Sequence, residues 1–169
     1  MNKKSVVVIG AGPGGEAAAK RLAEAGAQVT LIERAALGGL CLNWGCIPTK
    51  ILLEGVRLFH HARTSSVLAG GASLALNWEK LQEKKRSIVD LFRKSLDHRL
   101  GQLRVQVVRG NARFFIFLTL SVTSPNGVER IPFDAAVIAT GSRPFFPPPF
   151  DVLTDSILVL AAHPDDEVL

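Results

Sequence analysis

Apolar residues along the chain follow two different spacings, which together predict an α/β fold. Short runs of β-branched and aliphatic residues, typical of strands buried on both faces of a parallel sheet, occur at Ser5–Ile9, Gln28–Ile32 and Asp134–Ala139. Helical spacing and capping residues predict helices over Glu16–Ala25, which Gly26 closes, and over Thr49–Arg63 and Asn77–Leu100. A strand, a helix and a second strand in close succession indicate a Rossmann-like unit.

The spacing changes from that of helices to that of strands after the last helix. Strands are predicted at Val105–Val108, Ala112–Val122 and Val128–Phe133, with Pro125-Asn126-Gly127 as a hairpin turn. The phenylalanines in this part are expected in the core or in cross-strand pairs, namely Phe114, Phe115 and Phe117. The prolines at positions 144 and 147–149 indicate a linker. We therefore expect a parallel central sheet followed by an antiparallel β-meander.

Composition narrows the class of protein. The 169 residues are 47% hydrophobic, enough for the core of one domain. The net charge of +5, concentrated in 79–104, does not by itself indicate nucleic-acid binding. The apolar run after Lys3-Lys4 is too short for export or for spanning a membrane, and two cysteines make no disulfide scaffold. A cytoplasmic protein with a thiol pair is expected.

A glycine-rich turn joins the first predicted strand to the first predicted helix. It contains Gly-x-Gly-x-x-Gly at positions 10, 12 and 15, and Glu33 follows about 20 residues later, at the end of the second strand. Such glycines let the backbone approach a pyrophosphate at a helix N-terminus, and the acid can accept hydrogen bonds from an unphosphorylated ribose. An ordinary glycine turn is the alternative, but the strand–helix context favours dinucleotide binding.

The two cysteines form the second candidate site. Cys41 and Cys46 are five positions apart with Gly45 between them, and Pro48-Thr49-Lys50 follows as the start of a helix. A dithiol near a helix N-terminus is expected to have lowered thiol pKa values and to take part in disulfide exchange. Two inert buried cysteines are the alternative. The adjacent histidines at positions 60 and 61 point to different faces and make a poor metal pair, so no metal site is predicted.

These motifs together resemble the N-terminal FAD-binding region of the pyridine nucleotide–disulfide oxidoreductases. Within that family, the run from Cys41 to Lys50 is most similar to that of the dihydrolipoamide dehydrogenases. The resemblance implies that Cys41 exchanges with dihydrolipoamide and that Cys46 faces the flavin as the charge-transfer thiolate. It also implies a set of FAD-binding residues: Gly10, Gly12, Pro13, Gly14, Gly15, Glu33, Arg34, Gly39, Cys41, Lys50, Ala112, Ala139, Thr140 and Gly141.

The same resemblance implies parts of the reaction beyond this sequence. Full-length members pass electrons to NAD⁺, which they bind in a further domain, and they form homodimers that can serve 2-oxo acid dehydrogenase complexes. On this basis, residues 1–150 are expected to be the FAD-binding portion, with a fold incomplete at its C-terminus, and 151–169 a linker toward an NAD-binding domain. The chain is then a fragment, a truncated product or a boundary piece, inactive alone.

Two alternatives stay open. One is a non-catalytic remnant that binds FAD weakly or not at all. The other is a fusion to the first strand of a zinc-dependent N-acetylglucosaminyl deacetylase, because Ala162–Glu167 resembles the opening motif of those enzymes. In that motif His163 and Asp166 would bind zinc, and Asp165 would be the base. Two ligands fall short of the three that a catalytic zinc site needs. The linker interpretation therefore comes first.

Overall fold

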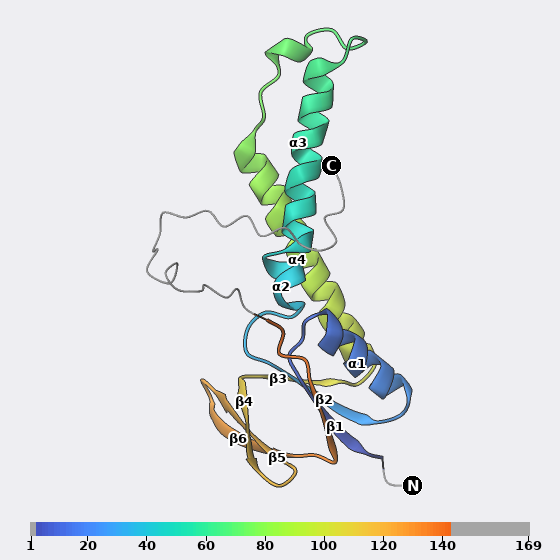
Figure 1. The fold of residues 1–169 in the computed structure, drawn as a ribbon, viewed down its shortest axis with the longest axis vertical. Coiled ribbons are helices and arrows are strands. Elements are labelled where there is room, and N and C mark those ends of the chain that lie inside the picture. Colours follow the sequence, from blue (N-terminus) through green and yellow to red (C-terminus); the bar gives the residue numbers. More distant parts are fainter. Residues whose placement is uncertain (1–2, 143–169) are drawn as a thin grey trace.

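The computed structural model describes residues 3–142, which form three layers and a long helical arm (Figure 1). The central layer is a parallel sheet with the spatial order β3-β2-β1-β7. Its strands are β1 (Ser5–Ile9), β2 (Gln28–Glu33), β3 (Gln106–Arg109) and β7 (Ala135–Ile138). Val6, Val7 and Val8 are all buried, which confirms that the first strand is covered on both faces.

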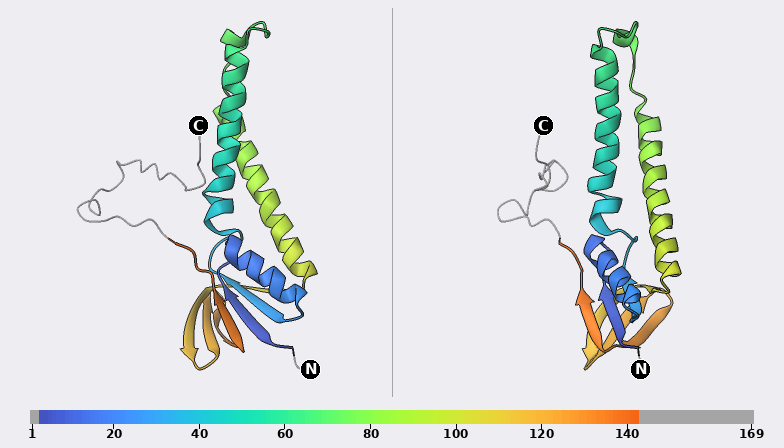
Figure 2. Two further views of the ribbon diagram at one scale, coloured as in Figure 1. Left: turned by 45° about the vertical axis from the view of Figure 1, so that its right-hand side comes forward. Right: turned by 90° about the vertical axis from the view of Figure 1, so that its right-hand side faces the viewer.

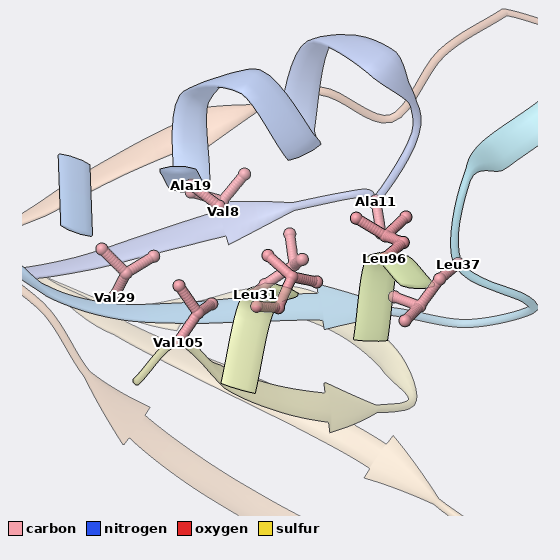
Figure 3. Close-up of a cluster of buried hydrophobic side chains, with 9 residues drawn as sticks. Val8, Ala11, Ala19, Val29, Leu31, Leu37, Leu96 and Val105 are labelled. Atoms are coloured by element: carbon pink, nitrogen blue, oxygen red, sulfur yellow. The ribbon is translucent and has the colours of Figure 1, made fainter. Parts of the chain in front are cut away.

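One face of the parallel sheet is covered by helices. Helix α1 (Pro13–Glu24) and the C-terminal end of α4 (Trp78–Gln102) lie over it. Side chains from both helices and from two strands meet in a single cluster (Figure 3), which includes Val8, Ala19, Leu31 and Leu96. Alternation along each strand sends these residues to one side and their neighbours to the other. Helix α1 is thereby fixed directly after β1.

The other face is covered by an antiparallel sheet in the order β4-β5-β6. Its strands are β4 (Asn111–Ile116), β5 (Thr119–Ser124) and β6 (Gly127–Pro132). A second cluster lies between the two sheets and contains Val7, Ile32, Leu120, Val122, Ile131 and Phe133. The predicted meander is therefore present, and Ser124 pairs with Gly127 across the predicted Pro-Asn-Gly turn.

A helical arm projects from the layered body (Figures 1 and 2). It consists of α3 (Cys46–Thr64) running outward and α4 running back beside it, joined by a connection that contains the short helix η1 (Gly71–Ser73). Asn77 caps α4 as predicted, because its side-chain oxygen accepts a hydrogen bond of 2.9 Å from the Lys80 N–H. A further short helix, α2 (Gly39–Asn43), lies at the foot of the arm.

The prediction of one long strand over Ala112–Val122 is wrong. The chain turns back at Phe117-Leu118, where Leu118 adopts a positive φ of 52°, and the segment forms β4 and β5 instead. Phe and Leu are not among the residues that usually form turns, so this hairpin could not be predicted from the sequence. The three phenylalanines are not in the core as one of the two expectations had it: Phe117 is 95% exposed, and Phe114 and Phe115 are exposed as well. The expected side-chain pairing is present for Phe114, whose ring lies edge-on to that of Phe133 with 6.2 Å between the centroids.

Several boundaries differ from those predicted. Helix α1 begins at Pro13 and α3 begins at Cys46, each three residues earlier than expected. The linker prolines, the boundary at 150/151 and the Ala162–Glu167 motif lie outside the described residues. Among residues 3–142, no helix is both long enough and apolar enough to cross a membrane.

Candidate functional site

The carboxyl ends of the parallel strands open into one groove. Because all four strands run in the same direction, the residues that follow β1, β2, β3 and β7 meet at one edge of the sheet, the usual ligand position in such folds. The groove has a volume of about 560 Å³. It brings together most of the predicted site residues: Gly10, Gly12, Pro13, Glu33, Arg34, Gly39, Cys41, Cys46, Ala112, Ala139, Thr140 and Gly141.

The glycine turn forms the floor of this groove. Gly10 has a φ of +100°, and a Cβ at this position would collide with the Ala139 carbonyl. A Cβ on Gly15 would collide with the Gly10 carbonyl, so Gly15 permits the close packing of helix on turn. Gly12 is the N-cap of α1, whose first N–H groups have no acceptor within the helix. The turn therefore presents free donors and partial positive charge to the groove.

Glu33 holds this turn against the end of β2. Its carboxylate is buried, and it accepts hydrogen bonds of 2.7 Å from the Ala11 N–H and 2.8 Å from the Ala35 N–H. Each oxygen retains a further lone pair, so the group can still accept from a ribose hydroxyl. The sequence predicts the ribose contact alone, which stays a prediction. The backbone contacts, which fix the turn, were missed.

The two cysteines lie beside the turn at the foot of the arm. Cys41 is in the middle of α2, and Cys46 is the first residue of α3, with Gly45 as the N-cap between the two helices. Both thiols are free and half-buried, and they are close enough for Cys46 to influence the ionisation of Cys41. A Cβ on Gly45 would lie 2.8 Å from the end of the exposed Leu40 side chain, which would have to move, and 3.2 Å from the Leu40 carbonyl oxygen.

The expectation of lowered thiol pKa values is wrong for Cys41. Burial raises the pKa of its thiol, and the S–H hydrogen bond and charge interaction with Cys46 raise it further. The Cys46 N–H and the charge of Lys50 lower it, but these effects are smaller. The sequence suggested a helix N-terminus beside both thiols, whereas Cys41 is inside another helix and partly removed from water.

The short helix α2 is held in place by contacts that the sequence did not reveal. Gly38 and Gly39 enter it with positive φ, and a Cβ on Gly39 would lie 2.6 Å from the Gly12 Cα. The start of α2 therefore packs directly on the glycine turn between β1 and α1. Asn43, at its end, is buried and is bonded by Arg93 of α4. The sequence offered one sign of a structural role for Asn43, which is a polar residue in an otherwise apolar motif. It offered no such sign for Arg93.

Some predicted residues do not reach the wall of the groove, and others were missed. Gly14, Gly15 and Lys50 are absent from the wall. Leu40 and Trp44 line it beside Cys41, one helical turn apart and both exposed. They form an apolar rim at the thiol end. Nothing in the described part of the chain brings three metal-ligating side chains together.

The groove fits a dinucleotide with a reactive ring. It extends from a dithiol, past a glycine turn with free N–H donors, to a buried carboxylate at the end of β2. A parallel α/β domain with a glycine turn at a helix N-terminus is a common dinucleotide-binding fold, and the thiol pair beside this turn agrees with the resemblance drawn from the sequence. The family comparison gives the same class: the model for pyridine nucleotide-disulphide oxidoreductases matches residues 4–168. The chain belongs to this family.

Similar proteins carry the name of one enzyme within it. The chain is 43% identical over 145 residues to a dihydrolipoyl dehydrogenase from Staphylococcus aureus, covering 85% of this chain and 31% of the relative. It is 36% identical over 152 residues to a dihydrolipoyl dehydrogenase from Bacillus subtilis, covering 87% and 33%. The chain thus spans about a third of the length of these relatives and corresponds to an FAD-binding region of dihydrolipoyl dehydrogenase type.

A solved structure shows the same fold. It is the Cu(II) complex of the HOCl-induced flavoprotein disulfide reductase RclA from Escherichia coli, with a TM-score of 0.72 and 31% sequence identity. The match covers 88% of this chain and 31% of that one.

Proposed function

We propose that the groove binds FAD in an extended form, with its pyrophosphate on the glycine turn. Gly12, Pro13 and the first N–H groups of α1 would hold the phosphates, and Glu33 would hold the adenosine ribose. Ala112 and Cys46 both line the groove, and the adenine is assigned to Ala112 and the flavin ring to Cys46. When bound, FAD supplies a two-electron acceptor beside the thiol pair. Family membership and the free donors of the turn support this assignment.

We further propose that Cys41 and Cys46 form the redox-active disulfide of a dihydrolipoamide dehydrogenase-like enzyme. A thiolate of the dithiol substrate attacks the Cys41 sulfur, and the bond to Cys46 breaks, leaving Cys46 as the thiolate. The second substrate thiol then attacks the mixed disulfide and releases Cys41. The substrate is oxidised to its disulfide, the cysteine pair gains two electrons, and the two substrate protons are released or taken up by the pair. The apolar rim of Leu40 and Trp44 suits an aliphatic dithiol.

The remaining parts of the proposal concern the whole protein. We assign residues 1–150 to the FAD-binding portion and 151–169 to a connection toward an NAD-binding domain, with NAD⁺ as the final acceptor. A homodimer, association with 2-oxo acid dehydrogenase complexes and a cytoplasmic location complete the proposal. The names of the relatives and the thiol pair support it, because a dithiol persists in a reducing compartment.

The observation that carries the proposal is that two cysteines from the adjoining helices α2 and α3 line one groove together with the glycine turn. The test is to purify the full chain, record its flavin absorbance and count its free thiols. We expect bound flavin, two free thiols after reduction and none after mild oxidation, without a disulfide-linked dimer on a non-reducing gel. A chain that purifies without flavin would support the non-catalytic remnant instead, and flavin without a reversible intramolecular disulfide would contradict the redox role of the pair.

Paired glycine variants locate the cofactor. The Gly12→Val variant should lose FAD, because its side chain fills the space between the turn and Gly39, whose Cα lies 3.8 Å from the position of a Cβ. Gly14→Ala is the matched control, because a Cβ there meets nothing within 4 Å and Gly14 does not line the groove. The measurement is FAD per protein after gel filtration. Equal retention by the two variants would contradict the placement.

A further inference from the structure

The side chain of Asn43 uses every polar atom of its amide inside the fold. The residue is 8% exposed. Its Nδ2 donates hydrogen bonds of 3.0 Å to the Leu37 carbonyl and 2.7 Å to the Gly39 carbonyl. Its Oδ1 accepts a hydrogen bond from Arg93 Nε. The amide therefore ties the last residue of α2 to the chain segment through which α2 is entered.

Arg93 brings a second helix into the same arrangement. It is on α4, fifty positions along the chain, and its Nη1 pairs with Asp90 Oδ1 at 3.0 Å one turn earlier on that helix. Asp90 and the helix direct the guanidinium, so that Nε is available to Asn43. We call the contacts of Asn43 with Leu37, Gly39 and Arg93 the Asn43–Arg93 clamp. A long-range bond to a charged donor is one of the stronger hydrogen bonds available to a protein.

The helix that the clamp holds cannot be stable by itself. Helix α2 has five residues and starts after a glycine with left-handed geometry, whereas isolated helices of this length do not form in water. Gly39 is packed on Gly12, and the Gly38 N–H donates to the Ala11 carbonyl at 2.8 Å. Those contacts fix the beginning of α2 on the glycine turn. The clamp fixes its end.

We propose that Asn43 and Arg93 are positioning residues for the redox pair, and that they hold Cys41 against Cys46 by fixing α2 to α4. Cys46 belongs to a different helix, α3, so the distance between the two sulfurs depends on how firmly α2 is held. This inference rests on the proposed redox role of the pair. It adds that the contact between Asn43 and Arg93 of the arm raises the equilibrium constant for forming the Cys41–Cys46 disulfide.

Two quantities should change when the clamp is removed. In the Arg93→Ala variant, α2 loosens and Cys41 loses part of its cover and its contact with Cys46. The ratio of the alkylation rate of Cys41 to that of Cys46 in the reduced protein should then rise about tenfold. The equilibrium constant for disulfide formation, measured in thiol–disulfide buffers, should fall about tenfold, because the two sulfurs spend less time together.

The experiment compares four variants of the full chain. Arg93→Ala, Asn43→Ala and the double variant test the clamp, and Arg86→Ala is the control, since it removes an exposed arginine from the same helix. Because Arg93 acts through Asn43, the double variant should change the alkylation ratio no more than Asn43→Ala does. Circular dichroism checks that each variant folds. If Asn43→Ala does not fold, Arg93→Ala carries the test, because its side chain is 35% exposed.

The outcomes separate this inference from the proposed function. An equal alkylation ratio in Arg93→Ala and Arg86→Ala would overturn the clamp, even where the wild-type disulfide forms normally. Additive effects in the double variant would overturn the route through Asn43. A wild-type chain without a reversible disulfide would contradict the proposed function. In that case the alkylation ratios of Arg93→Ala and Arg86→Ala would still show whether the clamp positions Cys41.

Discussion

At the scale of single residues, the thiol of Cys41 is held in its protonated form. Burial, then the hydrogen bond and charge interaction with Cys46, raise its pKa, and the Lys50 ammonium opposes them. Since the thiolate is the nucleophile, alkylation of reduced Cys41 should reach half its maximal rate at a pH above the ordinary thiol value of about 8.5. Lys50→Ala should move this midpoint further up, and Lys50→Arg should not. The measurement is alkylation rate against pH, followed by mass spectrometry of the Cys41 peptide.

Two neighbouring glycines should respond to alanine in opposite ways. A Cβ at Gly15 collides with the Gly10 carbonyl, which is backbone and cannot move aside, so Gly15→Ala should lower the free energy of unfolding by about 3 kcal/mol. A Cβ at Gly14 meets nothing within 4 Å, so Gly14→Ala should leave stability unchanged or raise it by up to about 1 kcal/mol. Urea denaturation of both variants checks this. Similar stabilities would show that the turn is not packed as described.

At the scale of elements, the β4–β5 hairpin carries a strained turn. Leu118 has a φ of 52°, which is unfavourable for a leucine backbone and destabilises the folded state. Its side chain is largely exposed, so burial compensates little for this cost. Leu118→Asn should raise the free energy of unfolding by about 1 kcal/mol, because asparagine tolerates this conformation. Leu118→Ala is the control: it removes the same side chain and keeps the strain. Denaturant midpoints that do not differ between the two would contradict the argument.

The elements that the sequence predicts well are those whose signals are local. The buried valine strand, the glycine turn and the Asn77 cap each depend on adjacent residues, and all three are present. The turn at Phe117-Leu118 could not be predicted, because tertiary packing imposes it on residues without turn chemistry. The phenylalanines of β4 are exposed because β4 is at the edge of its sheet.

The candidate site divides in the same way. Its glycines, Glu33 and the cysteines are found from motif spacing, because each set is close together in the sequence: the glycine turn between β1 and α1, Glu33 at the end of β2, and the cysteines in α2 and at the start of α3. The Asn43–Arg93 contact joins residues fifty positions apart and leaves no local signal. The direction of the Cys41 pKa shift was mispredicted for a related reason: burial of the thiol depends on how α2 packs, which the spacing of the cysteines does not determine.

At the scale of the whole molecule, the site lies where the three layers meet the arm. The strand ends of the parallel sheet and the glycine turn line the groove on one side, the meander supplies Asn111 and Ala112, and helices α2 and α3 supply the thiols. The glycine turn is therefore linked to the cysteines through direct backbone packing of Gly12 on Gly39. Substrate exchange at Cys41 and cofactor binding at the turn are expected to be coupled through α2.

The two halves of the proposed reaction should be separable in a polypeptide of residues 1–169. Disulfide exchange needs only Cys41 and Cys46, which the described residues bring together, so dihydrolipoamide should reduce the pair. Transfer to NAD⁺ needs the nicotinamide held against the flavin, and such positioning accounts for about 7–11 kcal/mol of barrier lowering. Within residues 3–142, the glycine turn that could hold a dinucleotide is already assigned to FAD.

We therefore expect an FAD-supplemented sample to show thiol exchange without NADH formation above background. The exchange is measured by mass spectrometry of the cysteine peptides and NADH by its absorbance, with Cys41→Ser as the control that abolishes the exchange. The relatives, of which this chain spans about a third, would supply the nicotinamide site from the rest of their length. Sustained NADH formation by residues 1–169 would require a nicotinamide site on this polypeptide, and would overturn the assignment of its groove to FAD alone.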